Sequence, residues 1–144
     1  MYDWFECKVK YERLQEDGSV KKVPETYLVE AFNFTEAEKR VTEELKPFVK
    51  GEFDIDNIHK VKYMEIFDSD VESDDRWYRL KLQFVTLDEK SGKEKKSVSA
   101  VLVKANSIAR SLENFEKGTK DSVTDFTITQ DVETPIMDVF HYGK

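Results

Sequence analysis

Trp77-Tyr78-Arg79-Leu80-Lys81-Leu82-Gln83-Phe84 is the stretch that decides the fold, because the chain opens with nearly the same pattern in Trp4-Phe5-Glu6-Cys7-Lys8-Val9-Lys10-Tyr11. The residue numbers of the two stretches differ by a constant offset of 73. The same offset relates six residues between Phe53 and Phe67 to six residues between Phe126 and Phe140. One offset shared by segments far apart in the chain predicts a tandem duplication of a small unit.

Each copy begins with a pattern typical of a long β-hairpin. Residues 4–12 alternate between apolar and charged side chains, as the residues of a half-buried strand do. Turn-forming residues around Gly18 follow, and the apolar residues from Tyr27 to Ala31 predict a second strand. The second copy repeats this strand up to Ala105, with an offset of 74. One residue has therefore been inserted in the second hairpin.

One helix is predicted after each hairpin. In the first copy, Thr35 can cap the helix in a capping box with Glu38, and Pro47 ends it. In the second copy, the apolar spacing predicts a helix over residues 107–117, with Gly118 as its C-terminal cap.

The predicted fold class is α+β, with tandem β-β-α-β-β repeats at residues 1–67 and 76–144. The apolar residues at 53–55 and 61–67 supply the last two strands of the first repeat. The acidic segment 68–75 has no periodicity and is predicted to be a solvated linker. A repeat of about 65–70 residues leaves one face of its antiparallel sheet wet, so a shared core is expected. We therefore expect a single compact, pseudo-symmetric domain over residues 1–144, in which each antiparallel sheet carries one helix.

The composition indicates a folded protein of a reducing compartment. The chain has 144 residues, of which 39% are hydrophobic, and its one cysteine cannot form an internal disulfide. No apolar run approaches the roughly 20 residues of a membrane span, so we expect a cytoplasmic protein with no membrane partner. The net charge of −7 disfavours a generic attraction to nucleic acid. This charge lies in residues 1–72, with 11 Lys and Arg against 18 Asp and Glu, whereas residues 73–144 are balanced.

No residue pattern indicates catalysis, a metal site or a cofactor. Cys7 shares a strand face with Val9 and Tyr11, which predicts a buried structural thiol. His59 and His141 lack further ligands at zinc spacing, and the acidic linker lacks the glycine and distal glutamate of a calcium loop. No phosphate-binding loop, nucleophile elbow or dinucleotide fingerprint is present. We therefore predict that the protein is not an enzyme and has no catalytic residue, no metal and no cofactor.

Basic and aromatic residues on the polar strand faces and at the hairpin ends form a candidate binding surface. Proteins that bind single-stranded nucleic acid combine such cations with rings that stack on bases. Lysines at hairpin ends also keep sheets soluble, and a tryptophan at a strand start also covers the rim of a core, so both explanations stay open. The candidate residues are Trp4, Lys8, Lys10, Lys21, Lys22, Trp77, Arg79, Lys81, Lys93, Lys95 and Lys96.

A resemblance to a known family rests on four motifs. These are Trp4-Phe5-Glu6-Cys7-Lys8, Asn33-Phe34-Thr35-Glu36-Ala37-Glu38, Asp88-Glu89-Lys90-Ser91-Gly92-Lys93-Glu94-Lys95-Lys96 and Ile136-Met137-Asp138-Val139-Phe140. With these motifs, essentially the whole chain resembles uncharacterised proteins of similar length from gut anaerobes and their bacteriophages, described as a domain of unknown function. The resemblance implies a phage or mobile-element setting, with roles such as binding replication intermediates or blocking a host protein. It implies no site residue.

Two functions follow from these observations as expectations. The first is a small non-enzymatic binding protein of phage type that acts through a protein partner. The alternative is a single-stranded nucleic acid binder that uses the basic hairpins and the strand-face tryptophans. A protein that sequesters a small nucleotide is a third class, and it would need a pocket between the repeats.

Overall fold

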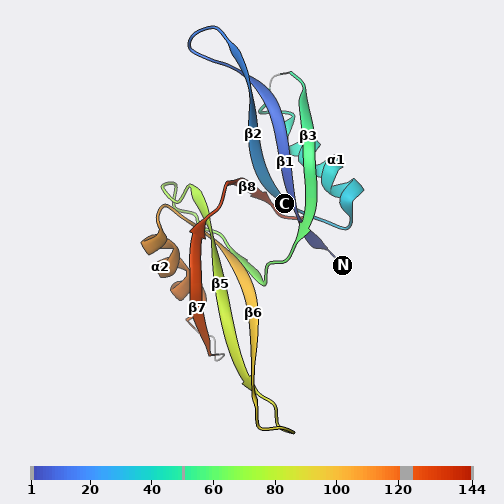
Figure 1. Cartoon of the computed structure of the whole chain (residues 1–144). Coiled ribbons are helices and arrows are strands. Elements are labelled where there is room, and N and C mark those ends of the chain that lie inside the picture. Colours follow the sequence, from blue (N-terminus) through green and yellow to red (C-terminus); the bar gives the residue numbers. More distant parts are fainter. Residues whose placement is uncertain (1, 50, 121–124, 144) are drawn as a thin grey trace. The chain divides into compact units, whose positions relative to one another are not determined.

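The computed structural model describes residues 2–49, 51–120 and 125–143 and has an α+β fold. Figure 1 shows two β-sheets, each with a helix packed on it. The predicted α+β class is confirmed. In chain order, the elements are β1 (Asp3–Leu14), β2 (Val20–Ala31), α1 (Phe34–Leu45), β3 (Phe53–Val61), β4 (Glu65–Phe67), β5 (Arg76–Leu87), β6 (Glu94–Ala105), α2 (Ile108–Gly118), β7 (Phe126–Glu133) and β8 (Ile136–Phe140).

The chain divides into two compact units, each of which holds one sheet and one helix. Unit 1 consists of Met1–Lys62 and Pro135–Lys144, and unit 2 consists of Tyr63–Thr134. The repeats at 1–67 and 76–144 divide the chain differently, because β4 lies in unit 2 and β8 lies in unit 1. Each unit therefore contains the last strand of the other half of the chain.

Both sheets have a long antiparallel hairpin at their centre. The strand order is β3-β1-β2-β8 in unit 1 and β7-β5-β6-β4 in unit 2. Whereas β3 and β7 run antiparallel to their neighbours, β8 runs parallel to β2 and β4 runs parallel to β6. The expectation of wholly antiparallel sheets is wrong at these two pairs. A tight hairpin makes neighbouring strands antiparallel, but β4 and β8 enter their sheets from the other unit, so no hairpin sets their direction.

The exchange of strands also changes the distribution of charge. Unit 1 has 12 Lys and Arg against 15 Asp and Glu, and unit 2 has 11 against 15. The contrast between an acidic first half of the sequence and a balanced second half therefore does not carry over to the folded units.

Each unit has its own hydrophobic core, between its helix and one face of its sheet, where a single shared core is expected from the sequence. In unit 1, α1 buries Ala37, Val41 and Leu45, which lie four residues apart on one helix face. Of the core positions predicted from strand alternation, Tyr11 and Phe84 are only half-buried. The other predicted positions are confirmed as buried: Cys7, Val9, Val29, Ala31, Leu80, Leu82, Val103 and Ala105. Burial raises the pKa of the Cys7 thiol to about 12.

The capping box of α1 lies two residues before its predicted place. The Asn33 side chain accepts a hydrogen bond from the backbone N–H of Glu36 at 2.8 Å, so Asn33 is the N-cap. The Glu36 carboxylate accepts in return from the backbone N–H of Phe32 at 3.0 Å. Thr35, the predicted cap, is the second residue of the helix.

Gly118 is the last residue of α2 and not its cap, which is Thr119. A Cβ atom at position 118 would lie 2.6 Å from the ring of Phe67 in β4. Glycine is therefore needed here for the close approach of β4 to α2, and not for a left-handed backbone.

Candidate binding site

The candidate residues of unit 1 lie on two faces of its sheet. Lys8, Lys10 and Lys22 share the face turned away from α1, whereas Lys21 lies on the opposite face, because successive strand residues alternate. Asp56 lies 3.6 Å from the ammonium of Lys10, and Asp54 lies 3.8 Å from that of Lys22. Trp4, which is half-buried, meets the ring of His141 edge-on, with the ring centres 5.3 Å apart. These cations are thus divided between faces and partly neutralised.

The candidate residues of unit 2 are divided in the same way. Arg79, Lys81 and Lys96 are exposed on the face turned away from α2, Lys95 is exposed on the opposite face, and Lys93 lies in the turn before β6. Trp77 is only 2% exposed, and the ammonium of Lys104 lies 5.7 Å from its ring centre. Trp77 therefore offers no ring on which a base could stack in this structure.

A cluster of exposed aromatic rings in unit 1, which the sequence patterns do not reveal, is the strongest candidate site. We call Tyr2, Phe32 and Tyr142 the aromatic patch. The ring of Tyr2 lies 4.1 Å from that of Phe32 and 3.9 Å from that of Tyr142, measured between ring centres. Their exposed fractions are 36%, 48% and 44%, respectively. Three large apolar rings are thus held together at the surface.

Arg40 of α1 holds the segments that carry the aromatic patch in place. Its guanidinium donates hydrogen bonds to the backbone carbonyls of Glu30 and His141, and it lies 5.2 Å from the ring centre of Tyr142. The carboxylate of Glu30 accepts from the backbone N–H of Tyr142 at 2.9 Å. Segments that end β2 and follow β8 are therefore tied to α1, which orders the rings before any partner binds.

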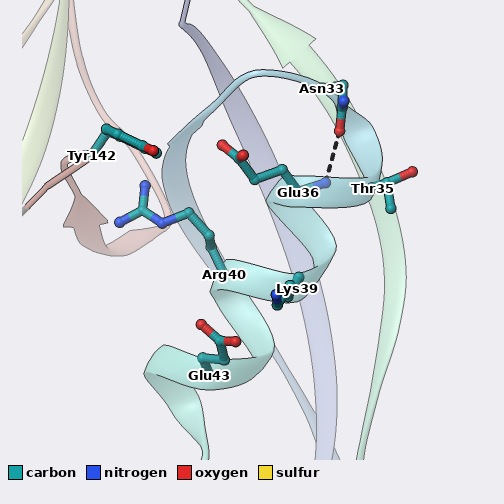
Figure 2. Close-up of a pocket in the computed structure, with 7 residues that line it drawn as sticks. All are labelled: Asn33, Thr35, Glu36, Lys39, Arg40, Glu43 and Tyr142. Atoms are coloured by element: carbon teal, nitrogen blue, oxygen red, sulfur yellow. Dashed lines mark hydrogen bonds between the residues drawn. The ribbon is translucent and has the colours of Figure 1, made fainter.

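A solvent-open hollow of about 500 Å³ lies beside the patch, along the first turns of α1. Figure 2 shows the Glu36 side chain extending from α1 toward Tyr142. The Arg40 side chain extends toward the same side from the following turn of the helix. A hydrogen bond with Tyr142, together with burial and the carboxylates of Glu36 and Glu30, raises the pKa of Tyr2 to about 12. The lining residues are Asn33, Thr35, Glu36, Lys39, Arg40, Glu43 and Tyr142.

The corresponding place in unit 2 is filled by the chain itself. The side chain of Asp74 is held by Ser69 at 2.5 Å, by Arg110 at 3.2 Å and by Asn114 at 3.3 Å. Asp74 is only 1% exposed, so the prediction that the acidic linker is merely a solvated connector is wrong at this residue. Burial alone would raise the pKa of this carboxyl, but the three hydrogen bonds hold it below its usual value.

The two places correspond because the two helices are built alike. The first residues of α1 and α2, Phe34 and Ile108, are related by the sequence offset of 74, and each follows a capping side chain. Arg40 donates to the carbonyl of Glu30, and its equivalent at this offset, Asn114, donates to the carbonyl of Lys104 at 2.9 Å. The same helix position therefore contacts the same strand position in both units. What differs is that residues 69–74 fill this place in unit 2, whereas in unit 1 Tyr142, which falls opposite Ser69, lines a hollow that stays open.

Within residues 2–49, 51–120 and 125–143, no three His, Cys, Asp or Glu side chains lie close enough together to hold a metal ion. The Ser111 hydroxyl and the Asp131 carboxylate form a partly buried hydrogen bond of 2.5 Å in unit 2, where burial raises the pKa of the Asp131 carboxyl. Over the same described residues, neither helix is long and apolar enough to cross a membrane.

Comparison with known proteins places almost the whole chain in one family. A model of the family described as "Domain of unknown function (DUF4494)" matches residues 3–142, which include all of unit 2, nearly all of unit 1 and most of the aromatic patch. No curated protein and no solved structure matches the chain. The protein therefore belongs to the DUF4494 family of domains of unknown function.

Proposed function

We propose that this protein is a small non-enzymatic binding protein that acts through a protein partner, which it contacts with the aromatic patch of unit 1. The observation that carries the proposal is the mutual contact of three exposed rings over a fixed arginine. Tyrosine, other aromatic residues and arginine are enriched where protein interfaces concentrate their binding energy. The rings are already ordered, so binding would cost little conformational entropy.

The proposal includes a duplicated fold of two equivalent β-β-α-β-β repeats. Strand registers support it: Val29 pairs with Phe140 in unit 1, and Val103 pairs with Phe67 in unit 2. The two valines are related by the offset of 74 and the two phenylalanines by the offset of 73, as in the sequence repeat. An arrangement of this kind would let one copy keep its helix site closed with the linker while the other copy uses its site for a partner. We further propose a cytoplasmic, phage or mobile-element setting.

Site-specific photocrosslinking tests the protein-partner proposal. We expect a protein that carries a photoreactive phenylalanine analogue at Phe32 to form one discrete adduct in host cells, because this ring lies within the patch. Phe48, which is 81% exposed just beyond α1, is the matched control position in the same unit. The adduct should disappear when Tyr142→Ala is added, because the neighbouring ring is lost.

Equal adducts from positions 32 and 48 would show non-specific contact and would contradict the proposal. So would the absence of any adduct from position 32 in a variant that remains folded.

A second candidate function, single-stranded nucleic acid binding, is favoured by one face of unit 2. Arg79, Lys81 and Lys96 are exposed there, and within the described chain none of them lies within 4.0 Å of a carboxylate. If this face tracks a phosphate backbone, binding of a labelled oligonucleotide should weaken as salt rises. Lys96→Gln should then lower the slope of log affinity against log salt by about 0.7. Lys95→Gln, on the opposite face of the same strand, is the control, and an equal effect of both changes in anisotropy titrations would exclude this reading.

A further inference from the structure

We infer that the hollow beside α1 receives a basic side chain, lysine or arginine, from an extended segment of the partner protein, with its cation between the aromatic patch and Glu36. The inference rests on the proposed function and adds the chemistry of the partner. Its support comes from the filled site in unit 2, from the carboxylate of Glu36 and from the exposed rings at the rim of the hollow.

The filled site in unit 2 shows what the corresponding place can hold. Residues 69–74 form a short turn, in which the backbone N–H of Asp74 donates to the carbonyl of Val71 at 3.0 Å. The carboxylate of Asp74 then reaches α2, where Arg110 and Asn114 donate hydrogen bonds to it. One charged side chain of a peptide segment, inserted beside the first turns of the helix, is thus the occupant in unit 2.

The charge of the receiving residue is reversed in unit 1. Arg110, which holds the carboxylate in unit 2, is the equivalent of Glu36 at the offset of 74, and each is the third residue after its N-cap. A carboxylate at this position complements a cation, as the guanidinium of Arg110 complements Asp74. One oxygen of Glu36 accepts from Phe32, and within the described chain no cation lies within 4.0 Å of its carboxylate. Glu36 is therefore able to take a basic group from outside.

The surroundings of Glu36 favour a cation over an anion. Each terminal nitrogen of Arg40 already donates one hydrogen bond to a backbone carbonyl, so part of the donor capacity of the guanidinium is used within the protein. Tyrosine and phenylalanine rings attract cations at their faces, and the rings of Tyr2 and Tyr142 lie at the rim of the hollow. The raised pKa of Tyr2, to which the Glu36 and Glu30 carboxylates contribute, agrees with a negative potential at this point.

Selection from a library of random displayed peptides, panned against the whole chain, tests the inference without a known partner. The wild-type protein should enrich peptides with lysine or arginine at one position by about tenfold, the change expected for one added ion pair with ring contact. Glu36→Arg, which introduces the residue type of unit 2, should shift the preference to aspartate or glutamate. Glu36→Gln should abolish the basic preference, while its amide oxygen still accepts from Phe32.

Slow reaction of Cys7 with thiol reagents checks that each variant is folded, because this thiol is buried in unit 1. The inference is overturned if the wild type shows no basic preference, or if a folded Glu36→Arg protein selects the same basic peptides. A discrete adduct from position 32 together with either result would overturn the inference alone and leave the protein-partner proposal standing. Absence of any adduct from a folded protein in which only position 32 carries the photoreactive residue would overturn the proposed function, and the inference with it.

Discussion

Asp74→Ala should lower the free energy of unfolding by about 3 kcal/mol, because it removes a buried carboxylate that three side chains hold. The loss has two parts. Arg110 and Asn114 lose the acceptor toward which they point, and residues 69–74 lose the contact that ties them to α2. Urea unfolding followed by circular dichroism measures the change.

Asp70→Ala is the matched control, because this acidic residue of the same segment is more exposed and forms no ion pair within the described chain. Its effect should stay within about 0.5 kcal/mol. The pKa of Asp74 is lowered in the folded protein, so its carboxylate stabilises the fold at neutral pH, and this contribution is lost as pH falls through the folded pKa. The difference between wild type and Asp74→Ala should therefore shrink in strong acid. A constant difference from neutral to acid pH, or an equal loss in Asp70→Ala, would contradict this account of Asp74.

The hairpins and helices could be predicted from the sequence because their signals are local. Alternation from Trp4 to Tyr11 identifies both the strand and its buried face, and Cys7 and Val9 are buried as that pattern predicts. The helices follow from apolar spacing and caps in the same way. The error at Thr35 is also local, since Asn33 and Glu36 form an equally good capping pair two residues earlier.

The partners of β4 and β8 could not be predicted, although both strands were expected. A run such as Glu65–Phe67 shows that a short strand exists, but it carries no information about which sheet it joins or in which direction. The pairing depends on contacts between residues distant in the sequence, such as Phe67 against Gly118. Long-range packing of this kind leaves no periodic signal in the sequence.

The candidate site escaped prediction for the same reason. Tyr2, Phe32 and Tyr142 are far apart in the sequence, and no periodic pattern links them. A usable signal existed in the repeated sequence pattern, because Phe32 falls opposite Asn106 at the offset of 74 and Tyr142 falls opposite Ser69 at the offset of 73. The aromatic patch thus lies at positions where the two halves of the repeated pattern differ in chemistry. Asp74 was hidden among neighbouring acidic residues, and only the distant Arg110 distinguishes it.

The exchange of last strands is the central structural claim, because it defines the units and ties Tyr142 to unit 1. A chain that ends at Thr134 lacks β8 and should therefore lose the core of unit 1, although the deletion lies in the second half of the sequence. β8 covers one edge of β2, and its Phe140 ring stacks on Tyr27 with 5.7 Å between ring centres. Loss of a packed phenylalanine costs about 3–5 kcal/mol, so protection of the unit 1 core should fall at least about a hundredfold.

The reaction rate of the Cys7 thiol in the chain ending at Thr134 is the most direct measurement. A chain ending at Phe140, which keeps β8 and lacks only the residues after it, is the matched control. We expect fast labelling of Cys7 in the chain that ends at Thr134 and slow labelling in the control. Hydrogen exchange should remain slow at Leu80 and Leu82 of unit 2 in both chains, because all four strands of that sheet are present. Slow labelling of Cys7 in the chain ending at Thr134, with fast exchange in unit 2 instead, would contradict the exchange of strands.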